Sequence, residues 1–192
     1  IGVWRTIFYL PSVVSGVAVA MIWIWFFHPD FGLFNAALAA IGVKGPSWLY
    51  SETWALPSLI IMNVWSIGPG MLIFLAGLQS IPKELYEAAQ IDGANEWRQF
   101  VFITIPMLAP QILFNTVIGI IGSYQVFTAS FVMTQGGPNN ATLSMVLYLY
   151  NKGFLTARFG YASAIAWILF IIIMVFTLIS LRSGRTADFY EA

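Results

Sequence analysis

Four long stretches of this chain contain no Asp, Glu, Lys or Arg, and they limit what it can fold into. They cover residues 6–29, 53–82, 99–151 and 159–181. A helix that crosses a bilayer needs about 20 mostly apolar residues, and each stretch is long enough for one. Charged residues make up 8% of the chain and hydrophobic residues 59%, whereas a soluble domain is about 25% charged. We therefore predict an all-α membrane protein, a polytopic transmembrane helix bundle, since a barrel would show alternating segments of about ten residues.

The third stretch is too long for one helix. It covers 53 residues and is interrupted by Pro106, Pro110 and the Gly-Gly-Pro sequence at 136–138, residues that commonly break helices. We expect one span before the last break, and a surface helix or loop at 139–151. The expected membrane spans lie near 6–27, 55–78, 108–131 and 159–181.

The loop at 79–98 is the most polar part of the chain, with six charged residues. Lys and Arg are commoner on the cytoplasmic side of membrane proteins. With this loop inside, five basic residues are cytoplasmic and three are external. The five are Arg5, Lys83, Arg98, Arg182 and Arg185, and the three are Lys44, Lys152 and Arg158. This bias predicts a cytoplasmic loop and tail, with 30–50 and 136–157 outside.

The loop begins with the pattern of a short helix. Pro82 is tolerated at a helix start, and Glu84 favours the same end through the helix dipole. Leu85, Ala88 and Ala89 recur at helical spacing and predict a common face. Small residues on an exposed helix let a partner's backbone come close, and a helix docked in a groove is a common mode of recognition. The alternative is an ordinary connecting loop rich in helix-forming residues.

A turn and a second helix follow. Asp92 and Gly93 predict a tight turn, in which Gly93 supplies a positive φ or a close approach and Asp92 caps the next helix. Residues 95–105 can form that helix, up to Pro106. The loop is therefore predicted to be a helix, a turn and a helix, held in water between two spans.

The same loop carries a family resemblance. The string Glu87-Ala88-Ala89-x-x-Asp92-Gly93-Ala94, followed by Phe100, Ile103, Pro106 and Pro110, resembles the EAA loop of ABC importer permeases. Other segments resemble the sugar-permease branch, which includes the maltose, lactose and glycerol-phosphate importers. They are Phe8–Pro11, Asn63–Trp65, Leu75–Pro82, Gly136–Pro138 and Phe159–Ala164. The resemblance covers essentially the whole chain, and its one small departure is Ile105, where the family usually has Leu before the proline.

The resemblance implies the type I permease fold of ABC importers, with residues 1–192 as a single permease domain in the cytoplasmic (inner) membrane. Such permeases usually have at least six spans, so a fragment lacking two N-terminal spans is expected. The implied partners are a second, homologous permease, two ATP-binding cassette subunits, an extracytoplasmic solute-binding protein and a sugar. ATP and Mg are then bound by the cassette subunits and not by this chain. The residues expected to dock those subunits are Glu84, Glu87, Ala88, Ala89, Asp92, Gly93 and Ala94.

Several kinds of chemistry find no support in the sequence. A P-loop needs a Gly-Lys pair, and no lysine here follows a glycine, so the chain is expected to be no enzyme and to leave ATP to another subunit. The expected spans contain no Asp, Glu, Lys, Arg or His, which argues against proton coupling, less well against sodium coupling, and favours an uncharged substrate. A net charge of zero gives no nucleic-acid footprint. His28 lacks companion ligands and is interpreted as an interfacial residue, not a metal ligand.

Small and polar residues in the second and third spans mark a candidate sugar path. Asn63 and Ser66 precede Gly68-Pro69-Gly70, where proline and glycine can kink a helix and free backbone carbonyls. The full set of candidates is Asn63, Ser66, Gly70, Gly119, Gly122, Ser123 and Gln125. The alternative is that the polar groups join helices and the glycines allow close packing.

The resemblance supports the path interpretation, because substrate contacts in the maltose branch fall near these positions and near Ile67. Only Asn63 keeps the expected residue type, and several bulky contact positions are glycine here, so the sugar site could instead lie in the partner permease. Two rival functions stay open at this point: an ion-coupled carrier and a membrane scaffold that transports nothing.

Overall fold

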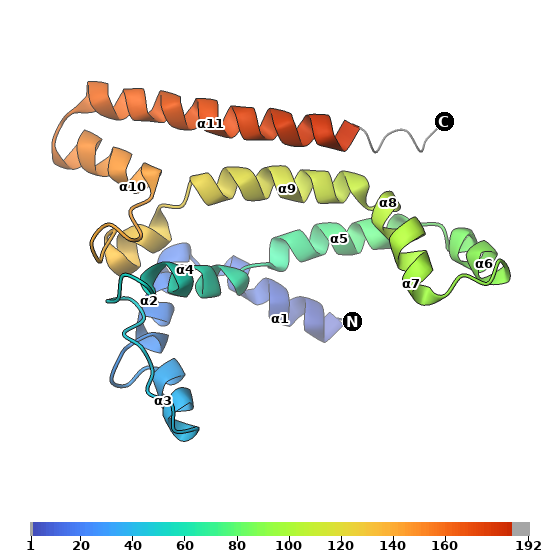
Figure 1. Ribbon diagram of the computed structural model, residues 1–192, viewed down its shortest axis with the longest axis horizontal. Coiled ribbons are helices and arrows are strands. Elements are labelled where there is room, and N and C mark those ends of the chain that lie inside the picture. The colour runs from blue at the N-terminus through green and yellow to red at the C-terminus, as the bar shows by residue number, and fades with distance from the viewer. Residues whose placement is uncertain (1, 186–192) are drawn as a thin grey trace. The chain divides into compact units, whose positions relative to one another are not determined.

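The computed structural model describes residues 2–185, in which the regular elements are α-helices and short π-helices (Figure 1). Their bounds are α1 (Gly2–Val13), α2 (Gly16–Phe26), α3 (Leu33–Ala40), α4 (Ala55–Val64), α5 (Gly68–Ser80), α6 (Lys83–Ile91), α7 (Glu96–Gln99), η1 (Phe100–Thr104), α8 (Ile105–Met107), α9 (Ala109–Tyr124), η2 (Ser130–Thr134), α10 (Met145–Tyr150), η3 (Asn151–Leu155) and α11 (Phe159–Arg185). The chain divides into two compact units. The first holds the residues up to Gly68 together with Ser123–Ile171, and the second holds Pro69–Gly122 and the residues from Ile172.

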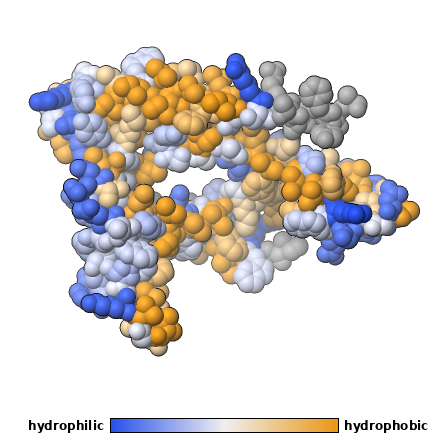
Figure 2. All heavy atoms as spheres, in the orientation of Figure 1, coloured by the Kyte–Doolittle hydropathy of each residue, from blue (hydrophilic) through white to orange (hydrophobic). Residues whose placement is uncertain are grey.

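Two segments are long and apolar enough to cross a bilayer: Ala55–Ser80 and Phe159–Ser183. Two further pairs of helices pass the same test only as bent pairs, so the described residues provide two spans, or up to four if each bent pair is one span. Large apolar side chains of α11 are exposed between Phe159 and Leu181, and the face of this helix seen in Figure 2 is mostly hydrophobic. A helix on the surface of a soluble protein exposes polar side chains, whereas α11 exposes apolar ones, which suits contact with lipid or with other membrane helices.

The first bent pair differs from the expected helix near 6–27. Val3–Val13 and Gly16–Phe26 meet at 101°. Pro11 has no N–H to continue the helical ladder, and the Ser12 hydroxyl donates to the Tyr9 carbonyl at 2.7 Å. Ser15 then takes an extended backbone, with φ −54° and ψ 134°. Hydropathy could not predict this break, because it depends on how apolar the residues are and not on the direction of the backbone.

The third expected span, near 108–131, is also interrupted. Glu96–Met107 and Ala109–Tyr124 meet at 65°, close to the two prolines that predicted a break there. Helix α9 ends at Tyr124, and the chain continues through a turn into η2. The segment expected as a surface helix or loop contains α10, whose first turn is capped because Ser144 Oγ accepts the Leu147 N–H.

The core of the first unit is aromatic. Its buried members are Val19, Ala20, Trp23, Phe27, Trp48, Leu49, Leu59 and Met133. Phe27 and Phe34 stack with centroids 5.1 Å apart. Asn35 closes this core from the loop side: its Nδ2 donates to the carbonyls of Pro29 and Pro46 at 2.8 and 3.2 Å, and its Oδ1 accepts Trp48 Nε1–H at 2.7 Å. One amide thus fixes the segment between α2 and α4, where three hydrogen bonds meet.

The second unit contains a close approach of α5 to α9. A β-carbon at Gly77 would lie 2.7 Å from Leu108 Cδ2 and 2.9 Å from Gln111, distances at which something must shift. One at Gly70, seven residues earlier and so on the same helical face, would lie 3.1 Å from Asn115 Oδ1. These two glycines let the helices pack closely, as small residues do between membrane helices.

Candidate functional site

The polar loop forms the helix, turn and helix that its sequence predicts, and α6 has two distinct faces. Glu84, Glu87, Ala88 and Ile91 lie on its exposed face, one to two turns apart. Tyr86 and Ala89 lie on the other face and are half-buried. Ala89, which was expected to share a face with Ala88 and to dock a partner, is less exposed than Ala88. The exposed face therefore consists of two carboxylates around small and branched apolar side chains.

Gly93 ends α6 through two backbone hydrogen bonds. Its φ is +77°, its N–H donates to the Gln90 carbonyl at 3.0 Å, and the Ala94 N–H donates to the Ala89 carbonyl at 2.9 Å. This is the Schellman motif, in which the residue after the C-cap takes a left-handed conformation. A β-carbon at Gly93 would meet nothing within 4 Å. Of the two reasons expected for glycine here, the positive φ therefore applies and a close approach within this chain does not.

The cap of the second helix is Asn95 and not Asp92. Asn95 Oδ1 accepts the Arg98 N–H at 2.9 Å, at the start of α7. Asp92 is instead the C-cap of α6. Asn and Asp are equally good N-caps. The Schellman turn, however, uses Gly93 and Ala94 after the C-cap, so α7 starts beyond the reach of the Asp92 side chain and is capped by Asn95 instead.

Two partly buried hydrogen bonds hold the loop together. Gln99, with 8% of its surface exposed, donates from Nε2 to the Ala94 carbonyl at 2.9 Å. Tyr86 Oη and Thr104 Oγ1 are hydrogen-bonded at 2.8 Å, across 18 residues of sequence. Sequence reasoning missed both contacts. Asn95 carried a readable capping signal, whereas the Tyr86–Thr104 pair has no local signal because its partners meet only through the turn.

The loop also has large apolar side chains exposed on its surface. Ile91 is 88% exposed and Trp97 is 70% exposed, with the Trp97 ring 5.8 Å from that of Phe100. Figure 2 shows hydrophilic and hydrophobic residues side by side at the α6–α7 end. Large apolar side chains exposed beside charged ones suit contact with a partner protein.

The candidate path residues are divided between the two units. In the first unit, the side chains of Asn63, Ser66, Ser123 and Gln125 are exposed. In the second, Gly119 and Gly122 have open space where a β-carbon would lie, while Gly70 packs against Asn115 as described above. Close packing within the described residues therefore accounts for Gly70 but not for the two glycines of α9.

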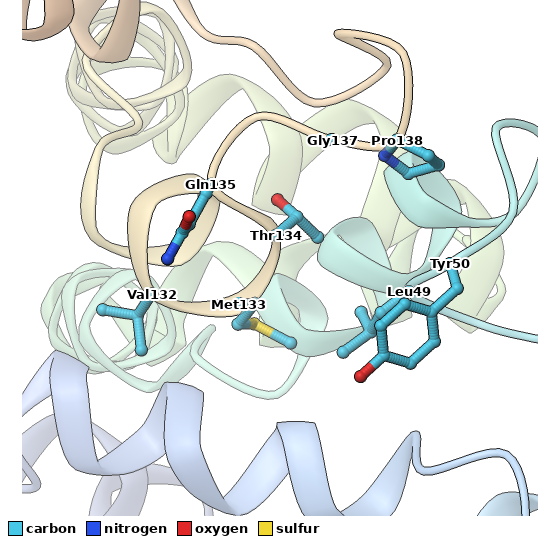
Figure 3. A pocket seen from close by; sticks show the side chains of 8 residues that line it. All are labelled: Leu49, Tyr50, Val132, Met133, Thr134, Gln135, Gly137 and Pro138. Carbon is cyan, nitrogen blue, oxygen red and sulfur yellow. The ribbon is translucent and has the colours of Figure 1, made fainter.

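A cavity of about 300 Å³ lies in the first unit, between the segment before α4 and the end of η2. Figure 3 shows Leu49 next to Tyr50, with Met133 on the neighbouring segment. Its other lining residues are Val132, Thr134, Gln135, Gly137 and Pro138. The rim is held by hydroxyls, since Thr142 Oγ1 donates to the Gly137 carbonyl at 2.9 Å and bonds Thr134 Oγ1 at 2.6 Å. Within the described residues, no cluster of three or more His, Cys, Asp or Glu could hold a metal ion.

Known proteins resemble this chain over nearly its full length. The probable ABC transporter permease protein YesP of Bacillus subtilis (strain 168) is 42% identical over 194 residues, which cover 99% of this chain and 62% of YesP. The lactose transport system permease protein LacF of Rhizobium radiobacter is 38% identical over 190 residues, which cover 96% of this chain and 63% of LacF. The chain therefore spans less than two thirds of the length of these relatives.

A solved structure is also similar. A chain in the crystal structure of a bacterial ABC transporter involved in the import of the acidic polysaccharide alginate superposes with a TM-score of 0.86 at 30% identity, covering 96% of this chain and 65% of that one. Residues 2–186 match the family described as binding-protein-dependent transport system inner membrane component. The expected family, all-α membrane fold and inner-membrane location are thereby confirmed. This chain belongs to the family of binding-protein-dependent transport system inner membrane components.

Proposed function

We propose that the chain is the permease subunit of an ATP-driven importer for an uncharged oligosaccharide or glycoside. Its family membership over residues 2–186 is the observation that carries this proposal. The saccharide class is supported by the lactose permease and by the alginate importer, to which the chain is similar. The absence of Asp, Glu, Lys and Arg from the four apolar stretches favours a neutral saccharide over an acidic one.

In this proposal, one of the two ATP-binding cassette subunits docks on the exposed face of α6 from the cytoplasm, and the other docks on the matching loop of the second permease. The face offers Glu84 and Glu87 for pairing with basic groups, around an apolar centre at Ala88 and Ile91. ATP-induced closure of the cassette subunits moves this helix, and the membrane helices respond by alternating access. A second permease completes the path, and an extracytoplasmic binding protein delivers the sugar to the opposite side.

The proposed path residues are Asn63, Ser66, Ser123 and Gln125 in the first unit and Gly119 and Gly122 in the second. The amides of Asn63 and Gln125 are exposed in this chain, and an amide left against lipid tails without a partner costs several kcal/mol. Such a side chain must meet another helix or a wet path. We assign Asn63 to the path, because an amide can exchange its hydrogen bonds between water and sugar hydroxyls.

Uptake by cells tests the proposal. Cells with and without a deletion of this gene are given radiolabelled lactose, maltose, trehalose, an arabinooligosaccharide and an alginate oligomer. We expect uptake of at least one neutral saccharide to disappear on deletion, and to be blocked by vanadate in membrane vesicles. Uptake driven by a sodium or proton gradient without ATP would favour the ion-coupled carrier, and uptake of only the alginate oligomer would overturn the neutral substrate. Unchanged uptake of the entire panel would refute the saccharide class.

A further inference from the structure

The hydrogen bond between Tyr86 and Thr104 joins two parts of the chain that have different tasks in the proposed importer. Tyr86 lies on the half-buried face of α6, opposite the exposed carboxylates. Thr104 is the last residue of η1, is 7% exposed, and is followed directly by α8. Their oxygens are 2.8 Å apart. The docking helix is thus tied to the segment that leads toward the apolar helix α9.

The η1 segment departs from regular α-helical geometry. A π-helical turn contains one more residue than an α-turn and is frequently found at functional sites. Just beyond it, the axis bends by 65° between Glu96–Met107 and Ala109–Tyr124. A force applied to α7 alone would pass through both η1 and the bend before reaching α9. The Tyr86–Thr104 bond joins the helix at the last residue of η1, so a force that it carries passes only through the bend.

The rest of the loop is braced so that it moves as one piece. Gln99 Nε2 donates to the Ala94 carbonyl at 2.9 Å, and the Schellman bonds at Gly93 close the end of α6. With the turn fixed at one side and Thr104 held at the other, α6 has little freedom to rotate independently. The hydrogen bonds therefore favour movement of α6, the turn and Thr104 as one rigid body.

We propose that Tyr86 is a positioning residue for energy coupling: its hydroxyl holds α6 to Thr104, so that movement of a docked ATPase subunit reaches α9 without slack. The inference rests on the proposed function for the docking of α6. Tyr86 does not touch the docked subunit, because its side chain lies on the half-buried face. Its loss therefore weakens transmission and leaves docking intact.

Tyr86→Phe tests this role by removing one oxygen and keeping the ring. The variant is expected to fold, because the freed Thr104 hydroxyl can bond a carbonyl of its own helix, as Thr116 Oγ1 does with the Ile112 carbonyl at 2.7 Å. Thr104→Val removes the other oxygen, and Thr104→Ser keeps it as the matched control. Because the two oxygens make one bond, the double variant should be no worse than either single variant.

The measurement uses the complete transporter in nanodiscs, with cysteine-free partner subunits. The chain itself contains no cysteine, so spin labels at Gln90→Cys on α6 and Thr116→Cys on α9 report on one internal distance. With ATP and vanadate, we expect the distance distribution to widen at least twofold in Tyr86→Phe and Thr104→Val, and to stay narrow in Thr104→Ser. Saccharide transported per ATP hydrolysed should fall about fivefold, the factor that corresponds to one hydrogen bond of about 1 kcal/mol.

The outcomes separate this inference from the proposed function. A Tyr86→Phe complex with the width and the transport ratio of the unchanged protein would overturn the positioning role. Loss of the ATPase subunits from that variant would overturn it too, because Tyr86 would then be a docking contact. If the unchanged complex transports none of the saccharides, the proposed substrate class fails, while the label distances still decide the role of Tyr86.

Discussion

Replacing Gly93 should detach the ATPase subunits through the backbone of the loop. Its φ of +77° lies in the left-handed region, which costs a residue with a β-carbon about 1–2 kcal/mol. Because a β-carbon at this site meets nothing within 4 Å, no steric clash inside the chain adds to this cost. Gly93→Ala should therefore reduce the population of the docking turn about 5- to 30-fold. Gly93→Asn should do less harm, since Asn tolerates the left-handed conformation.

Gly93→Asp should be the most damaging change. It combines some backbone strain with a negative charge beside the exposed face of α6, and a charge buried without a partner at an interface costs several kcal/mol. We expect the variant to insert in the membrane and pair with its fellow permease, but to lose the ATPase subunits on purification and to transport no saccharide. If purified Gly93→Asp complexes keep those subunits and transport at the normal rate, the docking assignment is wrong.

The chain contains a matched control at Gly42. This glycine follows α3 and has a φ of +76°, and a β-carbon there would also meet nothing within 4 Å. Its N–H donates to the Ala39 carbonyl at 3.0 Å, and the Val43 N–H donates to the Leu38 carbonyl at 2.9 Å, which is the same Schellman motif. Gly42→Asp thus imposes the same backbone change in a segment expected outside the cell. It should leave ATPase binding unchanged.

Four further predictions concern packing, the outer loop, the path and topology. Gly77→Leu should abolish assembly or lower the melting temperature by several degrees, because α5 and α9 are in contact there, whereas Gly119→Ala should be tolerated in melting scans because its site is open. Asn35→Leu should destabilise the first unit by about 1–3 kcal/mol per buried polar group left unpaired, seen as faster proteolysis of the segment between α2 and α4. Asn63→Ala should reduce uptake about tenfold or more with assembly intact, as loss of a hydrogen bond to the sugar predicts; normal uptake would place the sugar site elsewhere. A cysteine at Lys83 should resist an impermeant thiol reagent added to intact cells, and its labelling from outside would reverse the topology.

The sequence predicted the α6–turn–α7 loop well because the signals that form it are local. A helix start, a left-handed glycine and a polar cap act over three to five residues, and each has a residue preference strong enough to read. The one local error, Asp92 for Asn95, arose because two adjacent turn residues can both cap and only the length of the Schellman motif decides between them.

The bends were harder to predict than the apolar segments. Hydropathy located the stretches that contain α1, α2 and α9, but the 101° bend at Ser15 changes direction without changing polarity. The Tyr86–Thr104 bond was unreadable for a different reason. It joins residues 18 apart, and a tyrosine and a threonine on neighbouring helices carry no pattern until the turn between them is known.

The glycines of the second unit are of two kinds: some allow close packing inside this chain, and others face open space. Gly70 and Gly77 face α9 at distances that leave no room for a β-carbon without movement, so their role is met inside this chain. Gly119 and Gly122 meet nothing within 4 Å, although a glycine inside a helix costs about 1 kcal/mol relative to alanine. Helix packing within the described residues does not offset that cost. In the proposed importer, that cost is offset either by a closely packed helix of the second permease or by room for a saccharide. Bulky substitutions at Gly119 and Gly122 distinguish the two: loss of the permease pair indicates packing, and loss of uptake alone indicates a saccharide path.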